Sequence, residues 1–534
     1  MHRIGFLRGS RSVLSGRASA LRTIPIDSRL NSVAALHSRG GRKSGMSKSS
    51  SAGGANDWQA KLNAYKRRVL GEETPTQRGK NAEGSSQRQG ALGKRKAPQG
   101  SERNGAKRQA VEKAGKGRKP PSRPAKTAKG RKMRDPSTLY LSNPLKAPLC
   151  KEAAAFMRQG AGLRRRFEMF VGSTKGWRTS AKLSVRGNPP VIGLFAPGSH
   201  DVIPMTESVA HHPCINRVLT AVNEVMQQNK DLKGYDGINP GGVSYLCANV
   251  ETHSKQIQLI FVVNDKSPRP YETAILAVAK EVEARLSTKY GPVIHSVWVH
   301  CNPTTRYQNN IYSYDENAWH ILEGKERIIE VMTDNDGTLQ VKPKLYFPPY
   351  VFRQANTAGF ARIVASVRRW TLEGANTVEL YGGVGTIGLH LLDLIPSLIC
   401  SDENPHNKAC FDLSLKTLPA KLAKKASYRQ ASASKMAEDG ALDNAEQLIV
   451  DPPRKGMDES IILRAVQSPT LQRVIYVSCG FKSFQRDCKV FRDNGFSVVH
   501  GEGHVLFPGA NHLETLAIFE RVEEVAFRSK QLEN

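Results

Sequence analysis

The sequence lacks several features that would place it in a class at once. None of its eight cysteines forms a C-x-x-C pair, so the usual spacing of a zinc ribbon or a four-thiolate iron–sulfur site is absent. No run of about 18 apolar residues occurs, which argues against a membrane span. We therefore expect no metal cluster, no membrane partner, and reduced thiols in an intracellular compartment. The remaining candidates for a metal site, which have no paired ligand motif, are His211, His212, Cys214, His300 and Cys301.

Acidic residues are scarce at the start of the chain. Residues 1–45 carry nine basic residues and a single acid, Asp27, together with many serines and alanines. This composition is typical of an organellar transit peptide, although a basic tail without a targeting role would share it. We predict a mitochondrial or chloroplast location, and Met46 could start a second, nuclear or cytosolic form.

Apolar residues are scarce in residues 46–135, where GKRKAPQGSERNGAKRQ cannot bury a core, so we expect disorder there. Residues 1–135 hold 33 Lys and Arg against 8 Asp and Glu, a net charge of +25, whereas the rest of the chain carries +6. Such a region can bind the phosphates of nucleic acid without reading sequence. A solvated linker or a nuclear-import signal is the alternative. Within it, DWQAKLNAYKRRVLG predicts a short basic amphipathic helix.

Residues 136–345 have the pattern of an α+β domain. The runs AKLSVRG, VIGLFAP, QIQLIFVV and IHSVWVHC predict strands. The run HHPCINRVLTAVNEVMQQNK predicts a helix, because its apolar residues recur at helical spacing. These apolar residues are Ile215, Val218, Leu219, Val222 and Met226.

Residues 346–526 alternate more regularly. Four short apolar runs, TVELYGGVG, SLICSDE, EQLIVDPP and RVIYVSC, end in small or acidic residues, and helical stretches separate the first two and the last two. This order predicts an α/β, Rossmann-like domain with a doubly wound parallel sheet. The runs SVVHGEGHV and LETLAIFER predict an antiparallel hairpin at the sheet edge, and residues 527–534 a C-terminal tail. Ligands of such sheets bind beyond the carboxyl ends of the strands.

Two loops at predicted strand ends point to a cofactor. GVGTIG, Gly383–Gly388, follows a strand and opens the predicted helix TIGLHLLDL, and Glu403 lies 20 residues after Gly383, where an acid can bind ribose hydroxyls. A tight structural turn is the alternative, and NAD and S-adenosylmethionine both suit the arrangement. VDPPRKG places Asp451 and two prolines at another strand end. Rigid prolines can hold a loop open beside a cofactor, although an ordinary Pro-rich turn is also possible.

Several motifs together resemble a known family. VELYGGVGTIG, VDPPRKGMD, YVSCGFKSF and NHLETLAIF occur in the order and approximate spacing of the uracil-5 RNA methyltransferases, which make 5-methyluridine in transfer and ribosomal RNA. FRQANTAGF resembles the family's segment with a cofactor-contacting glutamine, and GWRTSAKLSVRG and APGSHDVIP resemble its RNA-facing domain. The resemblance covers roughly residues 145–522. CGFK and LYGGVGTIG look closest to plant and algal organellar-type members.

The resemblance implies a cofactor, a partner and residue roles. The cofactor is S-adenosyl-L-methionine and the partner is RNA, and we expect the chain to act as a monomer. Cys479 matches the catalytic cysteine, which adds to uracil C6 so that C5 can attack the methyl group. Glu514 matches the carboxylate base that then removes the C5 proton. The implied cofactor-binding residues are Gln354, Tyr381, Gly383, Gly385, Thr386, Glu403 and Asp451.

Some of these roles have alternatives in the sequence itself. A cysteine after an apolar strand can be a buried structural thiol, whereas a helix beginning near Lys482 and a nearby cation would lower the pKa of Cys479. Thr386 replaces a cofactor-binding amide of many members, and Gly480 stands where bacterial members often have Asn. The iron–sulfur cysteines of some members have no counterpart near Cys150.

We therefore expect an RNA uridine C5 methyltransferase acting on a transfer RNA T-loop or a ribosomal RNA, where the target base must leave its stack. An RNA cytosine C5 methyltransferase is one alternative. Those enzymes usually place their cysteine just after a DPP-type motif, where this chain has Arg454 and Lys455. A non-catalytic RNA-binding or RNA-folding protein that keeps the fold is another alternative, and a dehydrogenase is a third.

Overall fold

The computed structural model describes residues 138–196, 199–304 and 311–522, all of which belong to one compact unit, Asn81–Asn534. The expected transit peptide, low-complexity region, amphipathic helix and C-terminal tail lie outside the described residues. Within the described ranges, no helix is long and apolar enough to cross a membrane.

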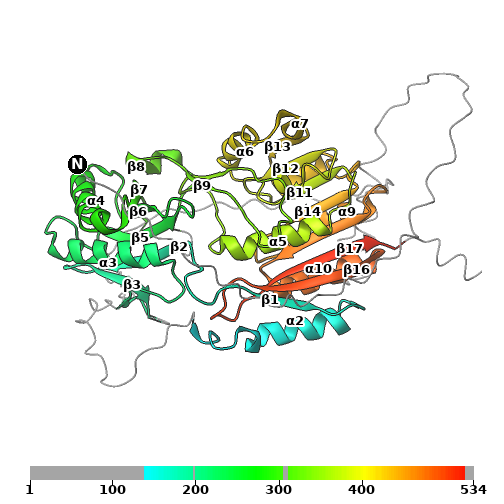
Figure 1. The fold of residues 1–534 in the computed structure, drawn as a ribbon, viewed down its shortest axis with the longest axis horizontal. Helices are drawn as coiled ribbons and strands as arrows, with labels where there is room; N and C mark the ends of the chain where they lie inside the picture. The colour runs from blue at the N-terminus through cyan, green and yellow to red at the C-terminus, as the bar shows by residue number, and fades with distance from the viewer. Residues whose placement is uncertain (1–137, 197–198, 305–310, 523–534) are drawn as a thin grey trace, which may run out of the picture. The chain divides into compact units, whose positions relative to one another are not determined.

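The upstream part of the described chain is a seven-stranded sheet with two helices on one face (Figure 1). Its strand order is β4-β3-β2-β5-β6-β7-β8. Neighbouring strands are antiparallel except β6 and β7, which run parallel and need the long crossover helix α4 between them. The elements are β2 (Ser180–Arg186), β3 (Val191–Phe195), β4 (Val202–Pro204), α3 (Pro213–Gln228), β5 (Val243–Val250), β6 (Ile257–Val263), α4 (Arg269–Tyr290), β7 (Ile294–Cys301), η4 (Glu316–Ala318) and β8 (Trp319–Gly324).

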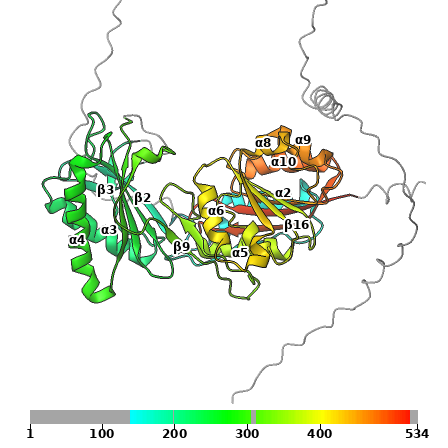
Figure 2. The same cartoon turned by 90° about the horizontal axis from the view of Figure 1, so that it is seen from above.

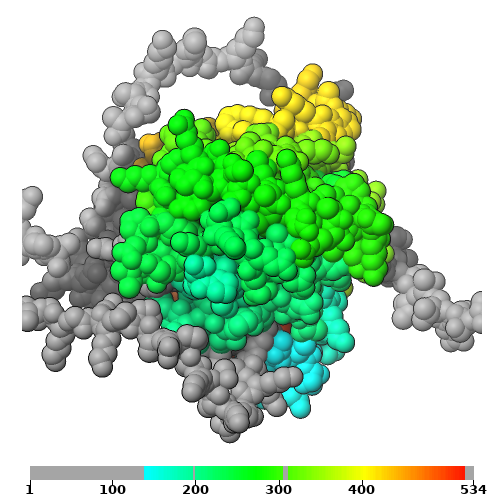
Figure 3. Space-filling model, turned by 90° about the vertical axis from the view of Figure 1, so that its left-hand side faces the viewer, coloured from blue at the N-terminus to red at the C-terminus, as the bar shows by residue number. Residues whose placement is uncertain are grey.

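The side chains of this sheet divide between its two faces because successive residues of a strand point to opposite sides. Leu259 and Phe261 of β6 pack with α3 and α4 in one core, whereas Ile260 and Val262 pack with Trp298 on the other face. The four strands and the helix expected here are confirmed, and the five apolar residues expected on one face of α3 are all buried. Residues of this domain cover much of the face shown in Figure 3.

The downstream part contains an eight-stranded mixed sheet in the order β1-β16-β17-β15-β14-β11-β12-β13. Five neighbouring strands from β13 to β15 are parallel, and β17 is antiparallel to both β15 and β16. All residues of β11 and β14 are buried, as expected for parallel strands covered on both faces. The strands are β1 (Glu168–Val171), β11 (Thr377–Leu380), β12 (Leu398–Asp402), β13 (Ala426–Gln430), β14 (Gln447–Val450), β15 (Arg473–Ser478), β16 (Phe496–Val505) and β17 (Glu514–Arg521).

Helices cover both faces of this sheet. Figure 2 shows α8, α9 and α10 on one side and α5 and α6 on the other. A two-stranded ribbon of β9 (Ile328–Glu330) and β10 (Leu345–Phe347) precedes α5. The expected α/β class with helices on both faces is confirmed. The helices are η3 (Pro144–Lys146), α2 (Pro148–Gln159), α5 (Thr357–Arg369), η5 (Gly388–Leu391), α6 (Asn407–Leu415), α7 (Ala420–Ala423), α8 (Ala433–Glu438), α9 (Glu459–Gln467) and α10 (Phe481–Asp493).

The hairpin of β16 and β17 forms as expected, but it is not the sheet edge. β1 pairs in parallel with β16 and covers its outer side, and Phe156 of α2 packs its ring against Phe481 and Phe484 of α10. Residues 144–171 therefore lie with the downstream sheet, although their place in the sequence assigned them to the α+β domain. A free edge of a ten-residue strand is a ready partner for another strand, which explains this return of the chain.

One further local expectation was wrong, and one strand was missed. The stretch after the glycine-rich turn is not an α-helix but turns and the short 3₁₀ helix η5, whose first residue, Gly388, donates its N–H to the buried Glu379 carboxylate at 3.2 Å. β13 was not expected at all. Its sequence, ASYRQ, is mostly polar and its side chains are largely outside the core, because it is an edge strand.

Helix α10 holds the loop that follows β14. Asp487, fully buried, accepts hydrogen bonds from the Tyr476 hydroxyl at 2.7 Å and the Met457 N–H at 2.8 Å. Arg486 donates to the Met457 carbonyl at 2.9 Å and the Lys455 carbonyl at 3.1 Å. The loop is therefore fixed to the helix by a buried carboxylate and an exposed guanidinium.

We expect Asp487→Ala to lower the free energy of unfolding by about 2–4 kcal/mol, because it leaves a buried hydroxyl and a buried N–H without acceptors. Urea denaturation followed by tryptophan fluorescence measures the change. Asp493→Ala on the same helix is the control, since it removes only a surface pair with Lys489 and should cost about 0.5 kcal/mol or less. Equal losses in the two variants would contradict this account.

Candidate active site

Four strand termini meet at one edge of the downstream sheet. β11, β14 and β15 are parallel, so the residues that follow them, Tyr381, Asp451 and Cys479, lie at the same edge. β17 runs the opposite way, and its Thr515 pairs with Ser478 of β15. Glu514, the first residue of β17, therefore lies at this edge beside Cys479.

A pocket opens at this edge of the sheet. Of the seven residues expected to bind a cofactor, five line it: Gln354, Tyr381, Gly383, Thr386 and Asp451. The other two, Gly385 and Glu403, are not in the lining. The five come from three separate segments of the chain, the segment before α5, the turn after β11 and the end of β14.

The glycine-rich turn has a conformation that explains its glycines. Gly383 and Gly385 have φ angles of 56° and 79°, in the left-handed region that glycine tolerates best. A side chain at Gly383 would meet nothing within 4 Å, so this residue faces open space. One at Gly385 would lie 2.6 Å from the Phe411 ring, so Gly385 serves the turn and its packing on α6 rather than the pocket.

The acidic residue expected to bind the cofactor after β12 does not line the pocket. Glu403 is exposed just beyond the strand, and its carboxylate adds to burial in raising the pKa of Tyr381. It is the preceding Asp402 that contacts the turn, since its carboxylate accepts the Gly383 N–H at 3.1 Å. Glu403 is therefore close to the pocket but is not part of its wall.

The electrostatics of Cys479 contradict one expectation. Burial, followed by the carboxylates of Glu514 and Asp451, raises the pKa of the Cys479 thiol to about 11, and Arg454 only partly opposes this. Although α10 begins at Phe481, two residues after the thiol, the expected lowering of its pKa is wrong. Loss of hydration and two neighbouring carboxylates outweigh the guanidinium of Arg454.

The two carboxylates are themselves unusual. Glu514 is 6% exposed, and burial together with Asp451 raises its pKa to about 8. Burial raises the pKa of Asp451 to about 7. Carboxyl groups that titrate near neutral pH can accept and release protons under working conditions, a property common at catalytic sites.

Sequence reasoning missed several residues here. Phe352 is 72% exposed and lines the pocket two residues before Gln354. The His512 ring lies 4.0 Å from the Glu514 carboxylate, and burial lowers its pKa to about 4. His390 is buried and lies 2.8 Å from the Thr386 carbonyl, which it holds in the turn. The sequence shows that these three residues lie within the segments FRQ, NHLET and TIGLH, but it does not show their exposure or their contacts.

Gly480 has a packing reason to be glycine. A Cβ atom there would lie 2.4 Å from the Arg454 carbonyl oxygen, which also accepts the Ser483 hydroxyl at 2.6 Å. The loop after β14 therefore passes directly against the residue after Cys479, and a larger residue would force that loop away.

The residues considered as metal ligands have other roles where the structure describes them. His211 contacts the Asn216 side chain at 3.1 Å, the His212 ring accepts the Cys214 N–H, and His300 stacks on Trp319. Across the described residues, no group of three or more His, Cys, Asp or Glu is arranged to hold a metal ion. All eight cysteines are free thiols.

We expect Asp451→Asn to raise the melting temperature by a few degrees at pH 8 and by less at pH 5.5. A carboxyl with a pKa raised to about 7 keeps its proton in the folded chain while the unfolded chain has lost it. Stability is therefore lost as pH rises from about 4 to about 7 and stays lost above that range. Differential scanning fluorimetry across this range measures the gap.

Asp458→Asn on the same loop is the control, because Asp458 is half-exposed in a surface pair with Lys455. A gap between Asp451→Asn and the unchanged protein that shrinks as pH rises would contradict the buried-carboxylate account.

No family model matches the chain, but individual proteins resemble it over about two thirds of its length. An uncharacterized RNA methyltransferase of Protochlamydia amoebophila is 34% identical over 357 residues, which are 66% of this chain and 87% of that protein. An uncharacterized RNA methyltransferase of Lactobacillus johnsonii is 27% identical over 362 residues, 65% of this chain and 73% of the relative.

The fold also has a solved counterpart. The tRNA (uracil-54, C5)-methyltransferase of Pyrococcus abyssi, in complex with S-adenosyl-L-homocysteine, matches with a TM-score of 0.52 and 19% identity, covering 69% of this chain and 83% of that one. This likeness confirms the α/β methyltransferase fold preceded by another domain. The 34% identity across most of the Protochlamydia protein shows that this chain belongs to the RNA methyltransferase family.

Proposed function

We propose that this chain transfers the methyl group of S-adenosyl-L-methionine to C5 of a uridine in RNA, with Cys479 as the nucleophile and Glu514 as the base. The observation that carries the proposal is the pairing of β15 with β17, which brings a thiol and a buried carboxylate together beside the pocket. The structurally similar Pyrococcus protein is a uracil-54 C5 methyltransferase, which supports the same chemistry here.

The reaction needs both groups because uracil C5 is a poor nucleophile. The Cys479 sulfur adds to C6, and the electron pair of the C5–C6 double bond forms an enolate whose C5 can form a new carbon–carbon bond. Bound S-adenosyl-L-methionine supplies the electrophilic methyl group on a positively charged sulfur. The methylated adduct still carries the C5 proton. Glu514 removes this proton, the double bond reforms, and the cysteine sulfur leaves C6.

The pocket residues fit this cofactor. Asp451 offers a carboxylate and Gln354 an amide to the polar groups of the cofactor. Gly383 has no Cβ atom on its open side, so the amino, carboxyl and ribose groups of the cofactor can approach the backbone there. A cationic ligand next to Asp451 and Glu514 would favour their ionised forms. With such a ligand bound, Glu514 would be ionised and able to act as a base.

The mouth of the site also suits RNA. Lys455 and Arg486 are exposed on the loop and helix beside Cys479 and can contact phosphates. The exposed Phe352 ring can stack on a base that has left its helix. A transfer RNA T-loop or ribosomal RNA uridine is the proposed target, the chain is proposed to act as a monomer, and the leader composition supports a mitochondrial or chloroplast location.

The test compares Cys479→Ala and Glu514→Gln with the unchanged protein on transfer and ribosomal RNA, using nucleoside mass spectrometry and denaturing gels. Cys479→Ala should make no 5-methyluridine yet bind S-adenosyl-L-homocysteine. Glu514→Gln should accumulate a denaturation-resistant RNA–protein adduct, because the C5 proton is no longer removed. Cys301→Ala, in the core of the upstream domain, is the control and should retain activity.

Each of the other possible outcomes would assign a different function or mechanism to this protein. Production of 5-methylcytidine would assign the cytosine reaction, and RNA binding without methyl transfer by the unchanged protein would assign a non-catalytic role. Turnover by Cys479→Ala would remove this cysteine from the mechanism.

The single-turnover rate should rise with pH between 6.5 and 8.5. Burial raises the pKa of the Cys479 thiol to about 11, so the fraction of reactive thiolate increases with pH throughout this range. Rapid-quench assays with saturating cofactor measure the profile. A rate that is flat or falls over this range would contradict the assigned protonation states.

A further inference from the structure

A single residue of the upstream domain holds both chain neighbours of Gln354. The Thr179 carbonyl, just before β2, accepts a hydrogen bond from the Arg353 Nη2 group at 2.7 Å. The Thr179 N–H and hydroxyl both donate to the Ala355 carbonyl, at 2.7 Å and 3.0 Å. Gln354 therefore lies between two residues that are tied to the same point of a different domain.

The guanidinium of Arg353 has two further partners. Its Nη1 group donates to the Val250 carbonyl at 2.8 Å and also pairs with Glu330. The side chains of Arg353 and Glu330 are 6% and 3% exposed. A buried ion pair is costly unless every charged group has partners in good geometry, and the planar fork of arginine restricts which directions satisfy them. The partners thus fix the path of the chain at residue 353.

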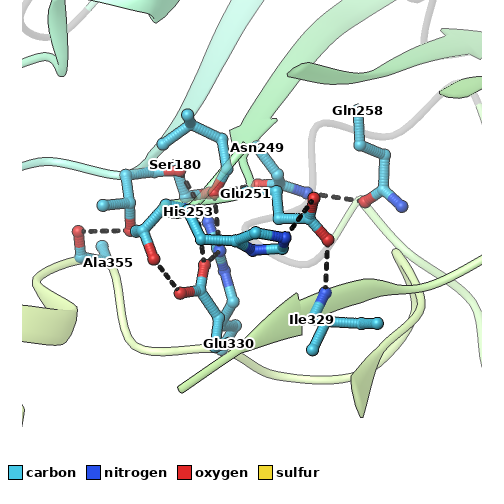
Figure 4. Close-up of polar contacts among 12 residues, drawn as sticks. Ser180, Asn249, Glu251, His253, Gln258, Ile329, Glu330 and Ala355 are labelled. Atoms are coloured by element: carbon cyan, nitrogen blue, oxygen red, sulfur yellow. Dashed lines mark hydrogen bonds and ion pairs between the residues drawn. The ribbon is translucent and has the colours of Figure 1, made fainter. Parts of the chain in front are cut away.

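Glu330 is in turn held by the upstream sheet. Its carboxylate accepts hydrogen bonds from the Thr252 hydroxyl and from the Thr252 N–H, the latter at 3.4 Å. A second buried carboxylate, Glu251, accepts the Ile329 N–H at 2.9 Å and attaches β9 to the same turn. Figure 4 shows Glu251 in contact with the Ile329 N–H, with Glu330 and the Ala355 carbonyl in the same group of polar contacts.

The same segment continues to the loop that precedes the proposed base. Asn356 caps α5 by accepting the Gly359 N–H at 2.8 Å, and its amide donates to the Leu506 carbonyl at 2.8 Å. Glu330, Arg353 and Gln354 also line the pocket together. Residues 353–356 therefore connect the upstream sheet, the pocket wall and the loop before Glu514.

We propose that Arg353 and Thr179 are positioning residues that hold Gln354 at the pocket wall, so that cofactor affinity depends on the upstream domain. This inference rests on the cofactor part of the proposed function, namely a ligand beside Gln354, and not on the uracil chemistry. A side chain displaced by about 1 Å loses much of its contribution to a bound ligand. The hydrogen bonds of Arg353 and Ala355 to Thr179 restrict such a displacement of the Gln354 backbone.

The test measures the affinity for S-adenosyl-L-homocysteine by isothermal titration calorimetry, without RNA. Arg353→Lys keeps the charge but cannot contact Thr179, Val250 and Glu330 together, and should weaken binding about tenfold. Thr179→Val keeps shape and backbone contacts, loses only the hydroxyl, and should weaken binding about threefold. It keeps the proposal testable if Arg353→Lys folds poorly, which thermal melting reports.

Arg473→Lys is the matched control. Like Arg353, Arg473 donates to a backbone carbonyl, that of Trp370 at 2.8 Å, and pairs with a carboxylate, that of Glu520. It lies at the opposite end of β15 from the pocket. It should lower the melting temperature without changing the affinity for S-adenosyl-L-homocysteine by more than about twofold.

A double-mutant cycle separates positioning from general destabilisation. Gln354→Ala should weaken binding, and Arg353→Lys should add no further loss in the Gln354→Ala background, because Arg353 acts through Gln354. The proposal would be overturned if the losses of affinity in Gln354→Ala and Arg353→Lys multiplied in the double variant. It would also be overturned if Gln354→Ala, Arg353→Lys or Thr179→Val left the affinity unchanged. Because the readout is cofactor binding alone, a failure to make 5-methyluridine leaves this result unaffected.

Discussion

The active-site chemistry depends on the antiparallel pairing of β17 with β15. Parallel strands place only their carboxyl ends at the ligand edge of a sheet, which here supplies Tyr381, Asp451 and Cys479. A strand that runs the other way brings its first residue to that edge, and Thr515 opposite Ser478 sets Glu514 beside the thiol. Because side chains alternate along a strand, a slip of one residue would turn the carboxylate to the other face of the sheet.

This arrangement gathers carboxylates where water is scarce. Burial raises the pKa of Glu379 and Asp451 to about 7 and that of Glu514 to about 8. Each ionised form is less stable here than in water, so the site lowers the stability of the fold around neutral pH. Departures of this kind are expected where function competes with packing. A cationic ligand reverses the penalty, which gives the pocket a physical preference for a sulfonium cofactor over a neutral one.

The two domains contribute different parts of one site. The downstream sheet supplies the proposed reacting groups, whereas Thr179 and Val250 of the upstream domain, together with Glu330 of β9, contact the segment that carries Gln354. A buried ion pair adds little net stability compared with apolar packing, so its value here is directional. It defines the path of the chain at one wall of the pocket.

The sequence by itself determined the local structure and the residue types of the site. Strand runs, the helix α3 and the glycine turn follow from patterns within short windows of the chain, because backbone preference and side-chain alternation are local. The roles expected of Asp451, Cys479 and Glu514 came instead from the resemblance of their motifs to a known family. Only the tertiary structure decided the place of β1, the raised pKa of Cys479, the exposure of Phe352, and the contact of Arg353 with Thr179, which lies 174 residues away. Burial and long-range pairing depend on which distant segments meet, and no local pattern encodes that.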